Sequence, residues 1–177
     1  MKTENLVHLI NPVGGKGCRI QMKLSIRPIV PADEPFLWEM LYQALYVSAG
    51  QSPLPRDIIE QPEMRQYVQD WGQPDDAGLI ACDGETSFGA VWVRRIRAYG
   101  FVDDDTPELS IAMLPGYRGL GIGTKLLNEL LMLLQSRYGA LSLSVSKENP
   151  ALRLYQRLGF AMVKDDGNSV TMKRVFV

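Results

Sequence analysis

A glycine-rich turn containing one arginine is the part of the chain whose residue types and spacing best fit a chemical role. Arg118 is followed by Gly119, Gly121, Ile122, Gly123 and Thr124, directly before a leucine-rich helical pattern. Glycines allow a backbone to approach a ligand closely, and the unpaired N–H groups at a helix start attract anions. An arginine adds a positive charge and several donors suited to a phosphate. The stretch from 118 to 124 therefore predicts a cradle for a diphosphate group.

A second segment, Asn149 to Phe160, strengthens this interpretation. Arg118-x-x-Gly121-x-Gly123 resembles the acetyl-CoA-binding motif R/Q-x-x-G-x-G/A of the GCN5-related N-acetyltransferase (GNAT) family. The second segment resembles that family's signature N-x-x-A-x-x-x-Y-x-x-x-G-F, except that Ala151 lies two residues after Asn149 instead of three. Two motifs at the expected spacing make the resemblance specific, and it covers about residues 23 to 177.

The resemblance implies a fold and a way of binding acetyl-CoA. The fold is α+β, in three layers, with a mixed and mostly antiparallel sheet whose fourth and fifth strands splay apart. Those strands would be 108–114 and 141–145. Pantetheine would lie between them, paired with main-chain groups of Met113 and Leu114, and the Met113 N–H would polarise the thioester carbonyl. The pyrophosphate would lie over residues 118 to 124, and Asn149 would bond the cofactor arm.

The resemblance also implies two catalytic side chains, Glu108 as the base and Tyr155 as the group that protonates the departing thiolate. A base is useful because an alkyl ammonium has a pKa near ~10.4. For each residue a structural interpretation stays open. Glu108 would otherwise be a surface carboxylate at a strand end, and Tyr155 would otherwise only pack in the core. Asn149 would cap a helix, which is compatible with cofactor binding.

Periodicity and turn residues predict the element order β-α-α-β-β-β-α-β-α-β-β, which is typical of a mixed α+β sheet. The expected strands are 24–29, 78–82, 86–97, 108–114, 141–145, 160–164 and 170–177. The expected helices follow Asp33 and span 57–70, 120–138 and 150–158, and Pro62 is expected to kink or bound the second of them.

Length and composition fit one domain with a proper core. The chain has 177 residues, of which 46% are hydrophobic, and its net charge of -1 excludes a generally basic nucleic-acid binder. Residues 1 to 22 carry no sustained period and are expected to be a flexible arm preceding an acetyltransferase domain at 23–177. Two cysteines, Cys18 and Cys82, favour a reducing cytoplasm, and no stretch is long enough to span a membrane.

The sequence therefore predicts an acetyl-CoA-dependent N-acyltransferase that acts on a primary amine of a small molecule, protein or peptide, without a metal. A non-catalytic acyl-CoA-binding module on the same fold is the alternative that stays open. A dinucleotide-binding oxidoreductase is disfavoured, because its glycine motif belongs at the first strand of a repeated βαβ array. Segments 49–56 and 97–107 are expected to shape the acceptor site, whose ligand they do not specify. A homodimer paired through the strand at 170–177 and a monomer both stay open.

Overall fold

A computed structural model describes residues 5–9 and 20–177 of the chain. Its strands are β1 (Asn5–Leu9), β2 (Ile20–Pro28), β3 (Ala77–Asp83), β4 (Thr86–Arg94), β5 (Glu108–Met113), β6 (Ala140–Ser146), β7 (Ala161–Asp165) and β8 (Ser169–Val175). Its α-helices are α1 (Glu34–Ala44), α2 (Pro62–Arg65), α3 (Ile122–Leu134) and α4 (Ala151–Arg157). Short 3-10 turns are η1 (Pro31–Asp33), η2 (Arg56–Glu60) and η3 (Pro115–Tyr117).

The described strands form one sheet in the order β1-β2-β3-β4-β5-β6-β8-β7. Neighbouring strands run antiparallel except β5 and β6, which run parallel. The α+β class with a mixed, mostly antiparallel sheet is thus confirmed. A closed turn at Gly84, whose φ is +57°, joins β3 to β4 as the Asp83-Gly84 pair predicted.

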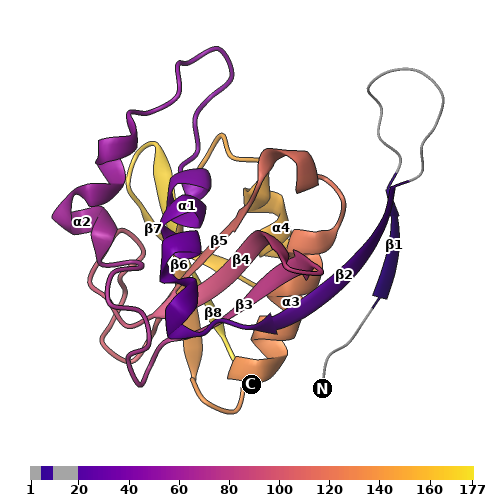
Figure 1. Cartoon of the computed structure of the whole chain (residues 1–177). Coiled ribbons are helices and arrows are strands. Elements are labelled where there is room, and N and C mark those ends of the chain that lie inside the picture. The colour runs from indigo at the N-terminus through magenta and orange to yellow at the C-terminus, as the bar shows by residue number, and fades with distance from the viewer. Residues whose placement is uncertain (1–4, 10–19) are drawn as a thin grey trace.

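Helices cover both faces of the sheet and produce three layers (Figure 1). On one face, α3 buries its leucine stripe against β3, β4 and β5, and the largest side chains of this cluster include Phe88, Leu126, Leu127, Leu130 and Leu141. On the other face, α1 and the segment around α2 pack over Ile80, Ala90 and Trp92. Because β3 and β4 are buried on both faces, their side chains are apolar nearly throughout, which explains the two clusters.

Two segments differ from the sequence-based expectation. The helix expected over 57–70 is divided at Pro62, the residue expected to kink or bound it: η2 and α2 form on either side of Gln61, because proline is accommodated at the first position of a new helix. The extent to residue 70 is wrong, since α2 ends at Arg65. No regular structure was expected before Met22, yet β1 pairs antiparallel with β2 from Asn5↔Leu24 to Leu9↔Ile20. The glycine-rich stretch with Cys18 lies outside the described residues.

The carboxy-terminal strand does not lie at a sheet edge. β8 is hydrogen-bonded to β6 on one side and to β7 on the other. The apolar edge that suggested a homodimer through 170–177 is therefore already covered within the chain, and β7 is the edge strand at this end of the sheet.

Close packing between β3 and β4 generates a prediction about stability. A Cβ added at Gly78 would lie 2.7 Å from the carbonyl oxygen of Val91 and 2.8 Å from Cβ of Trp92, and backbone atoms cannot move aside cheaply. Gly78→Ala is expected to lower the free energy of unfolding by about 1–3 kcal/mol in urea titration. Gly139→Ala is the matched control, because its Cβ meets nothing within 4 Å. Equal effects of the two substitutions would contradict the packing argument.

Candidate functional site

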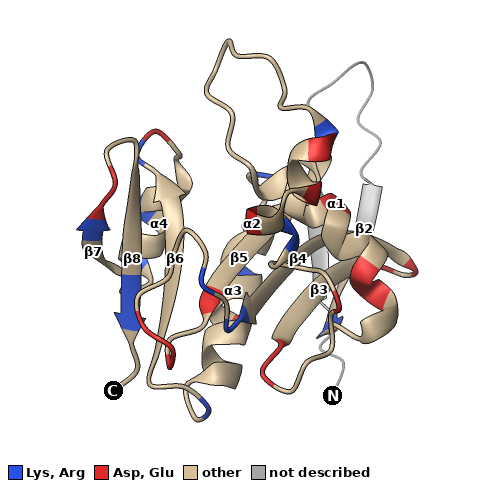
Figure 2. Ribbon diagram, turned by 90° about the vertical axis from the view of Figure 1, so that its left-hand side faces the viewer, with Lys and Arg blue, Asp and Glu red and all other residues tan. Residues whose placement is uncertain are grey.

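The site is built around the place where β5 and β6 part. In the described part of the chain, the ladder between them consists of the pair Glu108↔Ser142, with the Ser142 N–H donating to the Pro107 oxygen at 3.0 Å. Beyond this pair the strands diverge, so that β6, β8 and β7 form a group apart from β3, β4 and β5 (Figure 2). The splay expected between these two strands is confirmed.

Main-chain groups at the end of β5 face this opening. The Leu114 N–H donates to the Phe88 oxygen at 2.8 Å, which sets the phase of the β4–β5 ladder. Because successive residues of a strand point their N–H groups to opposite sides, the Met113 N–H points away from β4, toward the opening. The Leu114 carbonyl accepts the Tyr117 N–H at 2.9 Å. Leu114 therefore has both main-chain groups hydrogen-bonded within the chain, and its carbonyl oxygen keeps a second lone pair for a further donor. Its pairing with pantetheine stays a prediction.

The glycine-rich turn delivers a helix start with unpaired donors. Gly119 and Gly121 have φ of +74° and +77°, a backbone conformation that favours glycine, and α3 then begins at Ile122. The first N–H groups of an α-helix have no acceptor within the helix, and here no side chain of the described residues caps them either. A Cβ built at Gly119 or Gly121 meets nothing within 4 Å, which leaves open space above the turn. Donors, dipole and space together suit a phosphate group.

Arg118 is placed differently from the simple phosphate ligand that the sequence suggested. Its Nε donates to the Met113 oxygen at 2.9 Å, and its Nη2 donates to the oxygen and to Oε1 of Gln43 on α1 at 3.2 and 2.9 Å. The guanidinium therefore ties the turn to the end of β5 and to α1. Its positive charge stays beside the start of α3, but much of its donor capacity is used within the protein.

Asn149 lies at the start of α4, where Oδ1 accepts the Ala151 N–H at 2.9 Å. This is the helix-capping interaction that the sequence suggested. The loop after α1 reaches the neighbouring residue, because the Tyr46 hydroxyl donates to the Glu148 oxygen at 3.1 Å and Ser48 Oγ donates to Glu148 Oε2 at 2.5 Å. These contacts place the residues just before the segment 49–56, which is expected to shape the acceptor site, against Glu148, the neighbour of Asn149 in the chain.

Glu108 is a buried carboxyl, 3% exposed, so the surface interpretation of this residue is wrong. Its Oε1 accepts the Tyr67 hydroxyl at 2.5 Å and the Gly100 N–H at 2.8 Å. Its Oε2 has no hydrogen-bond partner among the described residues, and neither has Oγ of Ser142 on the facing strand. Burial disfavours the charged form and raises the pKa of Glu108 to about 7, while the two hydrogen bonds oppose the rise. A carboxyl with this pKa is suited to general-base chemistry near neutral pH.

Tyr155 lies on α4 in the cluster on the opposite face of the sheet, 8% exposed and packed edge-on against Phe160 at 6.0 Å. Burial raises the pKa of its hydroxyl to about 12, so it stays protonated at neutral pH. Glu108, by contrast, contacts Tyr67, which belongs to the α1 cluster. The two candidate catalytic residues therefore belong to opposite layers, with the opening between β5 and β6 in the sheet that separates them.

Tyr67 was not singled out from the sequence. It occupies an apolar position of the helix expected over 57–70, and no motif surrounds it. The available signal was its polar tip, since a buried tyrosine hydroxyl needs a partner. That this partner is Glu108, 41 positions later, follows only from the tertiary structure.

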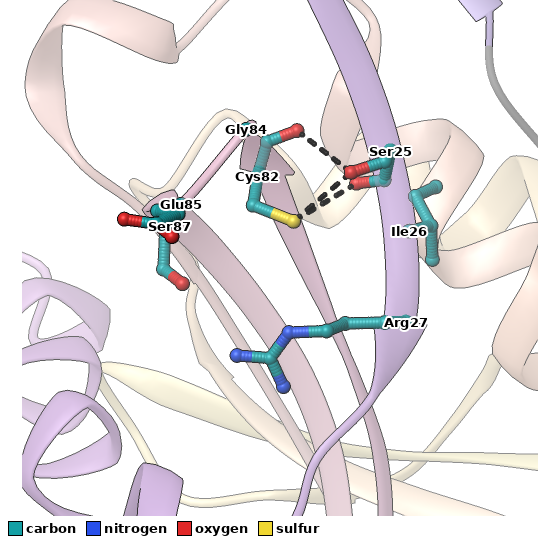
Figure 3. A pocket seen from close by; sticks show the side chains of 7 residues that line it. All are labelled: Ser25, Ile26, Arg27, Cys82, Gly84, Glu85 and Ser87. Atoms are coloured by element: carbon teal, nitrogen blue, oxygen red, sulfur yellow. Dashed lines mark hydrogen bonds between the residues drawn. The ribbon is translucent and has the colours of Figure 1, made fainter. Parts of the chain in front are cut away.

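Two surface hollows lie away from these residues. One, of about 360 Å³, lies between β2 and the β3–β4 turn, where Ser25 Oγ and Cys82 Sγ are 3.1 Å apart and Arg27 extends beside them (Figure 3). The other, of about 680 Å³, lies between residues 62–76 and the end of β4. Within the described ranges, no group of three or more His, Cys, Asp or Glu side chains could hold a metal ion. None of the helices described is long and apolar enough to cross a bilayer.

A family model described as Acetyltransferase (GNAT) family matches residues 38–160. The match covers well over half of the chain and includes both motifs, the β5–β6 junction and Glu108. The chain belongs to the GNAT family of acetyltransferases. A sequence search against curated proteins finds no match.

Solved structures with the same fold support this assignment. The PaiA N-acetyltransferase from Thermoplasma acidophilum, in complex with coenzyme A, is similar over 88% of this chain and 100% of its own, with a TM-score of 0.64 and 19% identity. The ribosomal-protein-S18-alanine N-acetyltransferase from Escherichia coli is similar over 86% of this chain and 94% of its own, with a TM-score of 0.61 and 19% identity. YncA from Salmonella typhimurium, solved with its cofactor acetyl-CoA, is similar over 88% of this chain and 95% of its own, with a TM-score of 0.61 and 21% identity.

The raised pKa of Glu108 predicts a pH-dependent cost of burial. The ordinary pKa of 4.5 applies to the unfolded chain and about 7 to the folded one, so the folded state binds more protons between these values. The contribution of neutral Glu108 to the free energy of unfolding is fully present below pH 4.5 and is lost as pH rises through 7. Glu108→Gln, which cannot ionise, is expected to gain about 3 kcal/mol relative to wild type between pH 4.5 and pH 8.5.

Urea titration of both proteins at the two pH values measures this difference. Any constant effect of the amide, such as a buried N–H without an acceptor, cancels because it is the same at both pH values. A stability difference that does not change with pH would show that Glu108 titrates as an exposed carboxyl.

Proposed function

We propose that residues 23–177 form an acetyl-CoA-dependent N-acetyltransferase that transfers an acetyl group directly to a primary amine in a ternary complex. The observation that carries the proposal is the position of Glu108: a buried carboxyl with one unpartnered oxygen at the last paired residue before β5 and β6 part. A purely structural carboxyl at this depth would be expected to have both oxygens hydrogen-bonded.

The residues around the opening fit acetyl-CoA, which supplies the acetyl group as a thioester. The start of α3, with Gly119, Gly121, Ile122, Gly123 and Thr124, offers uncapped N–H donors and open space for the diphosphate. Arg118 holds this turn in place and adds positive charge. The Met113 N–H points toward the opening, where it would donate to the thioester oxygen as charge develops on it. Asn149 would donate its free amide N–H groups to the pantetheine arm.

Glu108 acts as the general base in this proposal. Its Oε2 accepts the proton that the amine loses, directly or through one water, as the N–C bond forms and the C–S bond breaks. The carboxylate must be deprotonated for this step, so kcat/KM should rise with pH through about 7.

Tyr155 acts on the other side of the sheet, at the leaving sulfur. A phenol with a pKa of about 12 is a much weaker acid than a thiol, whose pKa is ~8.5, so complete proton transfer to a thiolate is uphill. We therefore assign Tyr155 the role of hydrogen-bond donor to the developing thiolate. Its removal should reduce the rate without abolishing it.

The acceptor is an amine, and two neighbours suggest the first ones to test. One is the ribosomal-protein-S18-alanine N-acetyltransferase, and another is a spermidine N-acetyltransferase chimera from Vibrio cholerae and hSSAT, with a TM-score of 0.57 and 18% identity. Spermidine and a peptide with an amino-terminal alanine are therefore the first acceptors, with thiol release as the readout. Release that depends on an added amine supports the transferase. Binding of acetyl-CoA without transfer to any amine of a broad panel would favour an acyl-CoA-binding module instead.

Calorimetric titration with acetyl-CoA tests the cradle. Wild type is expected to bind acetyl-CoA with micromolar affinity and not to bind NADH. Gly121→Asp should weaken the affinity at least tenfold, because its carboxylate would repel and crowd the diphosphate. Gly84→Asp is the matched control, since Gly84 also has a positive φ and open space around its Cβ, at the remote β3–β4 turn. Unchanged binding by Gly121→Asp would contradict the cradle.

The pH–rate profile of Glu108→Gln tests the base. At pH 7.5 the variant is expected to lose about 100-fold in kcat/KM, because a positioned general base contributes a factor of this order. The deficit should shrink toward pH 10, where the amine is increasingly neutral without help. Acetyl-CoA affinity should stay at the wild-type value. A variant with the wild-type profile would remove Glu108 from the mechanism.

A further inference from the structure

We propose that Tyr67 is the positioning residue of this site: it holds Oε1 of Glu108, so that Oε2 is the oxygen that takes the proton of the amine. The inference rests on the proposed function, and it names a residue from a segment that carries no family motif.

The two oxygens of the Glu108 carboxyl differ in their hydrogen-bond partners. Oε1 accepts two donors, the Tyr67 hydroxyl at 2.5 Å and the Gly100 N–H at 2.8 Å, whereas Oε2 has no partner among the described residues. Gly100 also limits the carboxyl sterically, because a Cβ at this position would lie 2.7 Å from both Cδ and Oε1 of Glu108. The orientation of the carboxyl is thus set from the Oε1 side, and the other oxygen is buried without a partner in the described part of the chain.

Tyr67 can position Glu108 because its own backbone is held from β4. Trp92 Nε1 donates to the main-chain carbonyl oxygen of Tyr67 at 3.0 Å. Arg94 Nη1 donates to the oxygens of Gln66 and Gln69 at 3.0 and 2.7 Å. These carbonyls follow the short helix α2 and have no continuing helix to bond them. Strand β4 is also the hydrogen-bonded neighbour of β5, so the tyrosine and the carboxyl are fixed to the same pair of strands.

The charged groups on the surrounding elements are engaged with other partners. Arg94, the register partner of Glu108 on β4, is ion-paired with Asp76 at 2.8 Å. Lys173 on β8 lies opposite Ser142 and is ion-paired with Asp103 at 2.8 Å. Tyr67 itself stays a neutral donor, because burial raises the pKa of its hydroxyl well above the ordinary value.

The Tyr67 hydrogen bond stabilises the ionised carboxylate and thereby lowers the pKa of Glu108 against the effect of burial. Tyr67→Phe removes this donor and keeps the ring in place. The pKa of Glu108 should then rise by about one pH unit, the size expected for one hydrogen bond to a charged group. The acid limb of kcat/KM should move to higher pH by the same amount.

Carboxyl ¹³C NMR titration of the glutamate-labelled protein measures this shift without any substrate, with the Glu108 signal assigned by its loss in Glu108→Gln. Tyr138→Phe is the matched control: Tyr138 is equally buried, and its hydroxyl donates to the Asp75 oxygen at 2.9 Å, away from Glu108. A midpoint shift in Tyr67→Phe alone supports the inference. Equal midpoints in both variants overturn it.

Kinetic measurements on Tyr67→Phe then show whether the hydrogen bond also positions Glu108 for the reaction. With the amine that wild type accepts, Tyr67→Phe should show the displaced acid limb and, at pH 9, where Glu108 is ionised in every variant, a remaining loss in kcat of about tenfold. A shifted NMR midpoint and acid limb with wild-type kcat at pH 9 would overturn the positioning role while leaving the proposed function intact. A shifted NMR midpoint with an unchanged acid limb would remove Glu108 as the base. Absence of transfer by wild type would overturn the proposed function itself.

Discussion

The early end of strand pairing between β5 and β6 is the constraint on which the rest of the site depends. Buried main-chain N–H and C=O groups need partners, and beyond Glu108 and Ser142 the facing side of β5 receives none from β6. The structure meets part of this need internally, since the Arg118 side chain bonds the Met113 oxygen. The Met113 N–H remains directed toward the opening. A sheet that opens in this way can offer its own main-chain groups to an extended ligand, without any element having to unfold.

A buried carboxyl, Glu108, lies at the last pair before this opening. Burying a carboxylate costs free energy unless hydrogen bonds compensate it, and here two donors serve one oxygen while the other has none. The raised pKa is the result of this incomplete compensation. The chain is thus less stable above neutral pH and holds a carboxyl with a pKa near 7, which is a combination expected of a functional site.

Local sequence patterns predicted most elements of the fold, because glycine, proline and capping residues act within a few positions of themselves. The Asp83-Gly84 turn, the leucine stripe of α3 and the Asn149 cap all follow this rule. The boundary expected at Pro62 within 57–70 is observed, but the helix does not continue past Arg65, where Trp92 and Arg94 bond the carbonyl groups of residues 66, 67 and 69. The strand over 5–9 was missed because pairing with β2, and not its own pattern, makes it a strand.

The sequence alone determined the class of protein and the glycine-rich turn before α3, since both depend on residue types at fixed short spacings. Only the tertiary structure decided how Glu108 is surrounded, that Tyr67 and Gly100 bond it, that the Leu114 N–H is bonded to Phe88 and that Arg118 is bonded to Gln43. The physical reason is range. A hydrogen bond between residues 41 or 75 positions apart depends on how the layers pack, and no local pattern encodes it.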